Sequence, residues 1–210
     1  MSGKLDMTPM YAMHDALPRE LEHIARIAGS AGSTGDPARI LRTAAGWRMF
    51  KTSLHVHHTT EDDALWPVMR QALADQPDEL ALLAEMEEEH AAIDPLIHSI
   101  DAALAGEEPV GDLLDSLVTR LRAHLEHEER EALPLIDATV TEKQWRHFGQ
   151  VHGSRIGPDA PRLVPWLLDG ASAETVTAML APLPEPARSA FQNQWQPAYA
   201  ALDRWGTTAP

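Results

Sequence analysis

Two segments of this chain repeat one pattern of histidine, acid and proline. Residues 57–67 read HHTTEDDALWP and residues 124–134 read HLEHEEREALP, so each has a glutamate four residues and a proline ten residues after a histidine. Residues four apart on an α-helix lie on the same face, one turn apart. The repeat therefore predicts two helices that each present a histidine and a glutamate side by side, as metal ligands do.

Apolar residues recur about every seven residues in four long segments, a spacing that predicts four amphipathic helices. The second segment has a favourable start at Asp36-Pro37, an N-cap followed by proline at the first helical position. Four long helices with short connections predict an all-α fold, an antiparallel four-helix bundle over residues 1–140.

Residues 141–210 differ in character from the bundle segments. They contain four of the six tryptophans and many prolines, with Thr141 and Ser172 placed as helix N-caps. We expect additional C-terminal helices that pack on the bundle, interrupted at Pro197. They would cover one end of the bundle or form a homodimer contact.

Histidine and glutamate interrupt the apolar pattern where a core residue is expected. An unpaired buried carboxylate costs several kcal/mol, so such residues need partners or a metal. Carboxylates that bridge two ions, with histidines as terminal ligands, are a known arrangement in bundle cores. The predicted ligands are His14, His57, Glu61, His90, His124 and Glu128.

Three neighbouring residues have open roles. His58 is either an additional ligand or a neighbour of the core, and Asp94 follows His90 by four residues, which suits a hydrogen bond to a ligand histidine. Tyr11 precedes His14 by about one helical turn. Its side chain is either an aromatic residue of the core or a phenol that points into the site.

Prolines follow the predicted ligands by four to six residues in all four segments. Proline removes a backbone donor and clashes with the carbonyl four residues back. One hypothesis is that kinks at one level splay the bundle and make room for ions. The four prolines are Pro18, Pro67, Pro95 and Pro134. The alternative is that Pro18 starts a helix and that Pro67 and Pro134 end theirs.

The composition disfavours some classes of binding partner and limits which atoms can bind a metal. With 17 basic and 32 acidic residues the formal net charge is −15, which disfavours nucleic acid and anionic membranes as partners. Cysteine is absent, so any metal binds nitrogen and oxygen, as iron, manganese and zinc can. No secretory signal pattern or membrane-spanning run is present, so we expect a cytoplasmic protein.

His14, HxxxE at 57–61, His90 and HxxxE at 124–128 together resemble the hemerythrin-like, or HHE cation-binding, family over about residues 7–139. The resemblance implies a four-helix bundle around two iron ions with an oxo or hydroxo bridge. Members of this family carry or sense dioxygen, sense iron or redox state, or handle nitric oxide and peroxide.

The chain departs from the oxygen-carrying members. They have HxxxH in the third helix and an aspartate five residues after the fourth-helix histidine, whereas here Asp94 follows His90 and Glu128 follows His124 by four. A site with more carboxylates favours peroxide or nitric oxide turnover, or O₂-dependent oxidation, over reversible dioxygen carriage.

We therefore expect a non-haem di-iron protein that binds dioxygen, peroxide or nitric oxide and turns over one of them, with manganese or zinc as less favoured metals. The alternatives are an iron or oxygen sensor without turnover, whose C-terminal helices carry the signal, and a metal-free helical interaction protein with a polar core.

Overall fold

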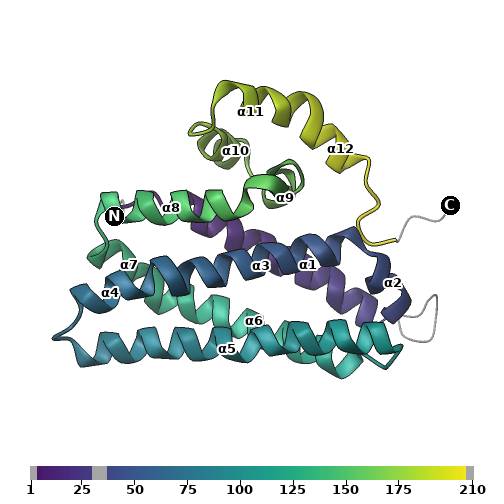
Figure 1. Ribbon diagram of the computed structural model, residues 1–210, viewed down its shortest axis with the longest axis horizontal. Helices are drawn as coiled ribbons and strands as arrows, with labels where there is room; N and C mark the ends of the chain where they lie inside the picture. Colours follow the sequence, from purple (N-terminus) through teal and green to yellow (C-terminus); the bar gives the residue numbers. More distant parts are fainter. Residues whose placement is uncertain (1–3, 30–36, 207–210) are drawn as a thin grey trace.

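The structure of this chain is a computed structural model that describes residues 4–29 and 37–206. These residues form helices and turns, and no strand occurs within the described ranges (Figure 1). Four long helices lie side by side with neighbours antiparallel, which confirms the predicted all-α bundle. They are α1 (Thr8–Gly29), α3 (Ala45–Ala64), α5 (Pro77–Gly106) and α6 (Gly111–His127).

Proline begins two helices of the bundle. The short helix α2 (Pro37–Thr43) starts at Pro37, and its expected N-cap Asp36 lies outside the described residues. Helix α5 starts at Pro77, followed by two acidic residues in its first turn. The N–H groups of the first turn have no acceptor within the helix, so proline, which lacks an N–H, loses no hydrogen bond there. The acidic side chains interact favourably with the positive end of the helix dipole.

The second predicted helix is divided into three parts, so the expectation of one continuous helix is wrong. Between α2 and α3, Ala44 takes an extended backbone conformation with φ −60° and ψ 122°. Beside it, the Gly46 N–H donates to the Arg204 carbonyl, and the Trp205 ring lies against Gly46. A second interruption, at Leu65, separates α3 from α4 (Trp66–Ala72).

The four prolines near the predicted ligands differ in their effects. Pro18 and Pro95 lie inside α1 and α5, which continue through them, so Pro18 does not start a helix. Pro67 and Pro134 lie in the first turns of α4 and of α7 (Leu133–Thr139), just after interruptions. The helical hydrogen-bond pattern is therefore interrupted near the ligands on two sides of the bundle.

The interruption before Pro134 is a π-helical segment, η1 (Glu128–Ala132), in which the Leu133 N–H donates to the Glu128 carbonyl five residues back. Pro134 has no N–H for the carbonyl of Arg130, and its ring clashes with that carbonyl. The turn therefore widens, and Glu128 is its first residue. Single π turns inside helices are frequent at functional sites.

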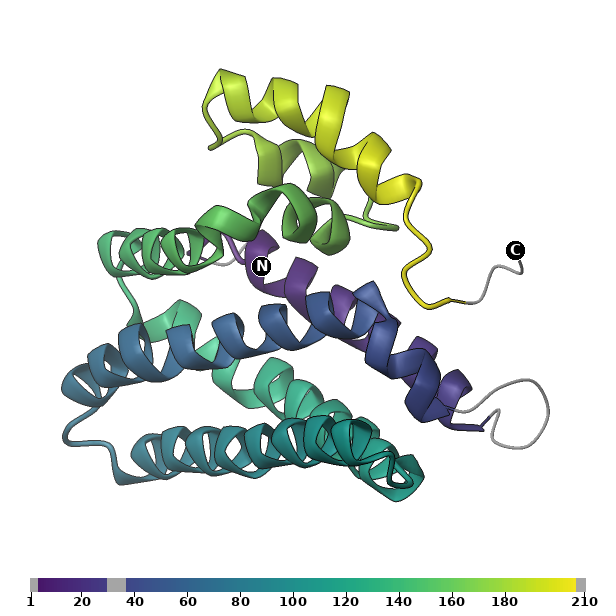
Figure 2. The same cartoon turned by 45° about the vertical axis from the view of Figure 1, so that its right-hand side comes forward.

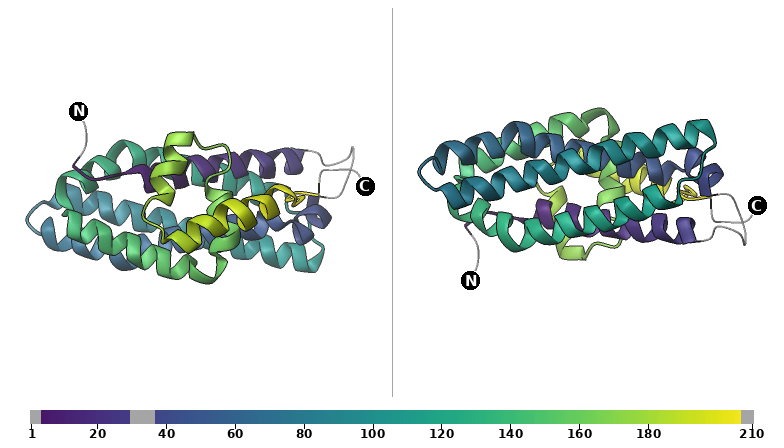
Figure 3. Two further views of the ribbon diagram at one scale, coloured as in Figure 1. Left: turned by 90° about the horizontal axis from the view of Figure 1, so that it is seen from above. Right: turned by 90° about the horizontal axis from the view of Figure 1, so that it is seen from below.

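The C-terminal residues form a layer of shorter helices on one side of the bundle (Figure 2). Helix α8 packs along α3, and α9 and α10 contact α1, so this layer covers the face made by α1 and α3. Figure 3 shows the layer across the middle of the bundle, on the side opposite α5 and α6. Its members are α8 (Glu142–Ile156), η2 (Gly157–Asp159), α9 (Ala160–Leu167), α10 (Ala173–Leu180), α11 (Glu185–Ala190), η3 (Phe191–Trp195) and α12 (Gln196–Ala200).

The predicted N-caps in this layer are confirmed. Thr141 accepts a hydrogen bond from the Gln144 backbone N–H in a capping box, and Ser172 accepts one from Thr175. The expected interruption near Pro197 is a second π-helical segment, η3, which ends two residues before that proline.

The apolar core of the bundle is divided into two clusters. One includes Leu17, Leu54 and Leu121, and the other includes Met10, Leu65 and Leu83. Along α1, α3 and α5, the buried histidines and Glu61 lie between residues of these two clusters. A polar layer thus crosses the bundle between two apolar ones. None of the described helices is both long and apolar enough to cross a membrane.

Candidate metal centre

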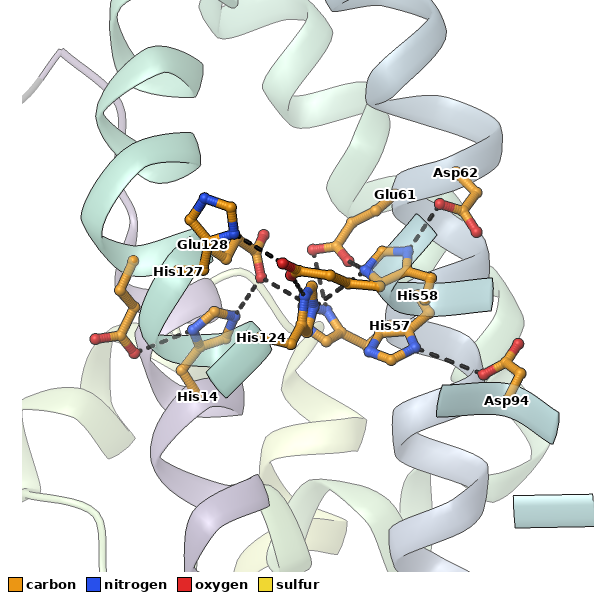
Figure 4. Close-up of polar contacts among 12 residues, drawn as sticks. His14, His57, His58, Glu61, Asp62, Asp94, His124, His127 and Glu128 are labelled. Carbon is orange, nitrogen blue, oxygen red and sulfur yellow. Dashed lines mark hydrogen bonds and ion pairs between the residues drawn. The ribbon is translucent and has the colours of Figure 1, made fainter. Parts of the chain in front are cut away.

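All six predicted ligands lie in this polar layer, and each is at most 3% exposed. They come from every side of the bundle. Figure 4 shows the side chains of five of them converging on the same region between the helices: His14, His57, Glu61, His124 and Glu128. His58, which the pattern left open, is also completely buried there. The layer therefore contains five histidines and two glutamates with almost no access to water.

The seven side chains form two groups that can each hold a metal ion. In the first, ligand atoms of His14, His57 and Glu128 all lie within 4.8 Å of one another. In the second, the same holds for His58, His90 and His124. We call these the carboxylate subsite and the all-histidine subsite.

The two glutamates reach both subsites. Glu61 lies 3.3 Å from His57 Nδ1 through Oε1 and 3.7 Å from His90 Nε2 through Oε2. Glu128 Oε2 lies 3.1 Å from His14 Nε2 and 3.8 Å from His124 Nε2. Each carboxylate thus faces one histidine of each group, as a carboxylate shared by two ions would.

The outer nitrogens of three histidines are hydrogen-bonded to carboxylates. His14 Nδ1 lies 3.0 Å from Glu129, His90 Nδ1 2.8 Å from Asp62, and His124 Nδ1 2.7 Å from Glu89. An ionised carboxylate only accepts hydrogen bonds, so each Nδ1 carries the proton that it donates. In the neutral ring, Nε2 is then an unprotonated ligand atom that points into the polar layer.

This protonation leaves lone pairs facing one another inside the layer. His90 Nε2 and His124 Nε2 are 3.2 Å apart, and neither has a proton to share in the neutral state. Of the ten buried polar side-chain atoms without a hydrogen-bond partner among the described residues, eight belong to His14, His57, His58, Glu61 and Glu128. Buried polar atoms normally have partners. A pair of cations would supply them, so the donor set fits metal ions.

Burial and charge shift the pKa values of these groups in opposite directions. Burial lowers the pKa of His14, but the carboxylates of Glu128 and Glu129 outweigh it and raise the pKa to about 9. Burial followed by the Glu128 charge raises the pKa of Glu61 well above its usual range. Burial raises the pKa of Glu128, but His14 and its neighbours outweigh that and lower it.

The two consecutive histidines of α3 behave differently from His14. Burial lowers the pKa values of both His57 and His58 well below the usual range. These imidazoles are therefore neutral at pH 7, the form that binds a metal ion. Protons on His14 and Glu61 are the ones that a bound metal would displace.

His58 is the candidate site residue for which the sequence pattern left two roles open. Its ring stacks on His90 with centroids 4.0 Å apart and an interplanar angle of 10°. Asp94 lies outside it, 3.6 Å from His58 Nδ1, which is longer than a hydrogen bond. With His58, the polar layer contains five buried histidines, one more than the four predicted as ligands.

The remaining histidines and Tyr11 lie outside the two subsites. Tyr11 is 49% exposed, so both expected roles, a core aromatic and an inward phenol, are wrong. His55, His98 and His147 are exposed, and His23 stacks on Trp205. His127 lies at the edge, with its Nδ1 2.8 Å from Glu89.

Comparison with known proteins agrees with this geometry. The family model for the hemerythrin HHE cation binding domain matches residues 8–136, which include all seven side chains of the polar layer. Searches of curated proteins and of solved structures gave no significant match. The match covers more than half of the chain, and we conclude that the chain belongs to the hemerythrin HHE cation-binding domain family.

Proposed function

We propose that this chain is a non-haem di-iron protein that binds dioxygen, peroxide or nitric oxide and turns over one of them. The observation that carries the proposal is the pair of three-residue groups joined by two shared carboxylates. His14, His57 and Glu128 would hold one ion, and His58, His90 and His124 the other. Glu61 and Glu128 would lie between the ions.

The donor set supports iron over the alternatives. Imidazole nitrogen and carboxylate oxygen suit iron, manganese and zinc, and the chain has no thiolate to offer. Anionic oxygen from two glutamates favours the ferric state. A bound iron pair would supply the redox chemistry, two electrons per centre. Manganese and zinc are the competing ions, and metal analysis of the purified protein separates the three.

The burial of the site supports a small ligand. Each of the seven side chains is at most 3% exposed, so an organic substrate cannot contact them without large movements of the helices. Dioxygen, peroxide and nitric oxide are small enough to reach such a site through ordinary fluctuations of the packing. The protein's own contribution is to exclude water and to hold the imidazoles and carboxylates in place.

Turnover tests the proposal. Iron-loaded protein is mixed with dioxygen, hydrogen peroxide or nitric oxide and an electron donor, and consumption is counted per di-iron centre. Consumption of many equivalents supports an enzyme. A single stoichiometric change in the visible spectrum supports a carrier or sensor instead, and no reaction with any of the three molecules contradicts the proposal.

The second candidate is a sensor, and the contacts of α8 favour it. Arg155 on α8 lies 3.4 Å from Thr60 Oγ1 and 2.7 Å from Asp63, residues that flank Glu61 on α3. A change at Glu61 on metal binding would therefore reach the C-terminal layer directly. Hydrogen exchange of residues 141–206 should slow when metal binds if this reading holds, and stay unchanged if it does not.

A cytoplasmic location and a homodimer that forms through the C-terminal layer are further parts of the proposal. Cell fractionation and sedimentation of the purified protein test them.

A further inference from the structure

The carboxylates around the centre are distributed unevenly between the two subsites. The carboxylate subsite has Glu128 as a member, and one outer carboxylate, Glu129, lies on its His14. The all-histidine subsite has three imidazoles and no carboxylate as members. Three outer carboxylates lie beside these rings. Asp62 and Glu89 are hydrogen-bonded to Nδ1 of His90 and His124, and Asp94 Oδ1 lies 3.6 Å from His58 Nδ1, longer than a hydrogen bond.

This distribution adds negative charge around the all-histidine subsite. Apart from the shared Glu61 and Glu128, its members are imidazoles, which as metal ligands carry no charge to balance a divalent or trivalent ion. A carboxylate that accepts the outer N–H of an imidazole makes the ring a stronger ligand and fixes its orientation. Asp62 and Glu89 act on His90 and His124 in this way, and all three outer carboxylates add negative charge beside the subsite that has no carboxylate member of its own.

The three carboxylates are held in place by contacts between helices. Each lies on a different long helix from the histidine that it contacts, so each pair also links two helices: Asp62 links α3 to α5, Glu89 links α5 to α6, and Asp94 links α5 to α3. Glu89 is held further by His127, whose Nδ1 lies 2.8 Å from Oε1.

Because the three carboxylates are partly exposed, their charges lose little hydration free energy in these positions. The three carboxylate side chains are 34–38% exposed, whereas the histidines that they contact are at most 2% exposed. A partly hydrated carboxylate stays charged without the large penalty of full burial. In Figure 4, Asp62 and Asp94 lie at the outer edge of the cluster.

We propose that Asp62, Glu89 and Asp94 are positioning residues that make the all-histidine subsite a tight metal site. This inference rests on the proposed function, because it assumes that both subsites bind metal. It concerns the second ion alone and leaves the affinity of the carboxylate subsite unchanged.

The test is a zinc titration of metal-free protein, followed by competition with a coloured chelator, because zinc has no redox chemistry to complicate the result. Wild-type protein should bind two zinc ions. The Asp62→Asn, Glu89→Gln, Asp94→Asn triple variant keeps the side-chain shapes and loses the charges. It should bind the first ion with unchanged affinity and the second about 10- to 100-fold more weakly.

Matched controls come from neighbouring positions on the same helices. Glu88→Gln removes charge from an exposed residue of α5 that faces no histidine of the site, and zinc affinity should not change. Glu129→Gln should weaken the carboxylate subsite instead. In a His58→Ala background, which already damages the all-histidine subsite, the three substitutions should have less effect than in the wild type.

The outcomes separate the two claims. If wild-type protein binds fewer than two zinc ions, the proposed function fails. If it binds two and the triple variant binds both with wild-type affinity, or loses both subsites equally, the positioning role is overturned. If the triple variant does not fold, the three single variants take its place and should each weaken the second ion.

Discussion

His57 and His58 are consecutive residues on α3 that belong to different subsites. Neighbouring residues on a helix point about 100° apart, so two adjacent side chains cannot serve one ion but can serve two ions on either side. Periodic spacing identifies His57 through its partner Glu61, whereas the acid four residues after His58, Asp62, contacts His90 on α5 instead. The role of His58 follows from the position of α5, whose His90 ring stacks on it.

Replacement of His58 should remove one metal ion. In the His58→Ala variant, the all-histidine subsite keeps only His90 and His124, so we expect one tightly bound ion per chain in place of two. His55→Ala is the matched control on the same helix, because His55 is exposed and should leave two ions bound. Two tightly bound ions in His58→Ala would show that this residue is not a ligand.

The raised pKa of His14 predicts how the stability of metal-free protein depends on pH. Its value of about 9 in the fold lies above the ordinary 6.5, so protonated His14 stabilises the fold fully below pH 6.5. That contribution is lost as the pH rises through about 9, and the raised pKa of Glu61 acts in the same direction. The free energy of unfolding should therefore fall between pH 6.5 and 9.

Urea denaturation of chelator-treated protein over this pH range measures the effect. The His14→Gln variant should have a flatter profile, since it lacks the titrating group. A wild-type stability that is constant or increases over the same interval would contradict the charge balance described for His14.

At the scale of the helices, the sequence predicted the number, the direction and the buried faces of the bundle. The seven-residue period predicted buried positions for three histidines and both glutamates. All five are buried: His14, His90, His124, Glu61 and Glu128. The interruptions were not predictable in the same way. The break at Ala44 lies beside Trp205, which is distant in sequence, and periodicity alone does not distinguish a π turn from an α-helical one.

The π-helical segment makes Pro134 a test of how Glu128 is placed. Pro134→Ala restores a backbone donor for the Arg130 carbonyl and removes the clash with it. We expect the segment to tighten toward an α-helix and Glu128 to turn away from His14 and His124. Zinc binding by the carboxylate subsite should weaken while the helical content stays the same.

Circular dichroism and zinc titration together test that expectation. Pro9→Ala, at the start of α1 and distant from Glu128 in sequence, is the matched proline control. Unchanged zinc affinity in Pro134→Ala would mean that Glu128 does not depend on the π turn.

At the scale of the whole molecule, the end of the described chain is attached to the bundle by Trp205. Its ring is 3% exposed, and its Nε1 donates to the buried Glu20 carboxylate at 3.1 Å. A Cβ added at Gly46 would lie 2.4 Å from this ring. Glycine at this position therefore allows the ring to lie directly on α3.

Gly46→Ala should displace Trp205 and lower the free energy of unfolding by roughly 1–3 kcal/mol, the usual cost of an overpacked core. The tryptophan fluorescence should move toward the spectrum of exposed indole, and the chain should become easier to cleave near residue 204. Gly149→Ala is the control, since a Cβ at that position meets nothing within 4 Å. A Gly46→Ala variant with wild-type stability would contradict this attachment.

The most direct test of the account is the amount of iron bound per chain. Metal-free protein is loaded with ferrous iron under anaerobic conditions, freed of excess metal and analysed for iron and protein. The two subsites predict two iron ions per chain, and loss of two-iron binding in both Glu61→Ala and Glu128→Ala. His147→Ala, at an exposed position, should keep both ions. Wild-type protein that retains one iron ion or none would contradict the paired centre.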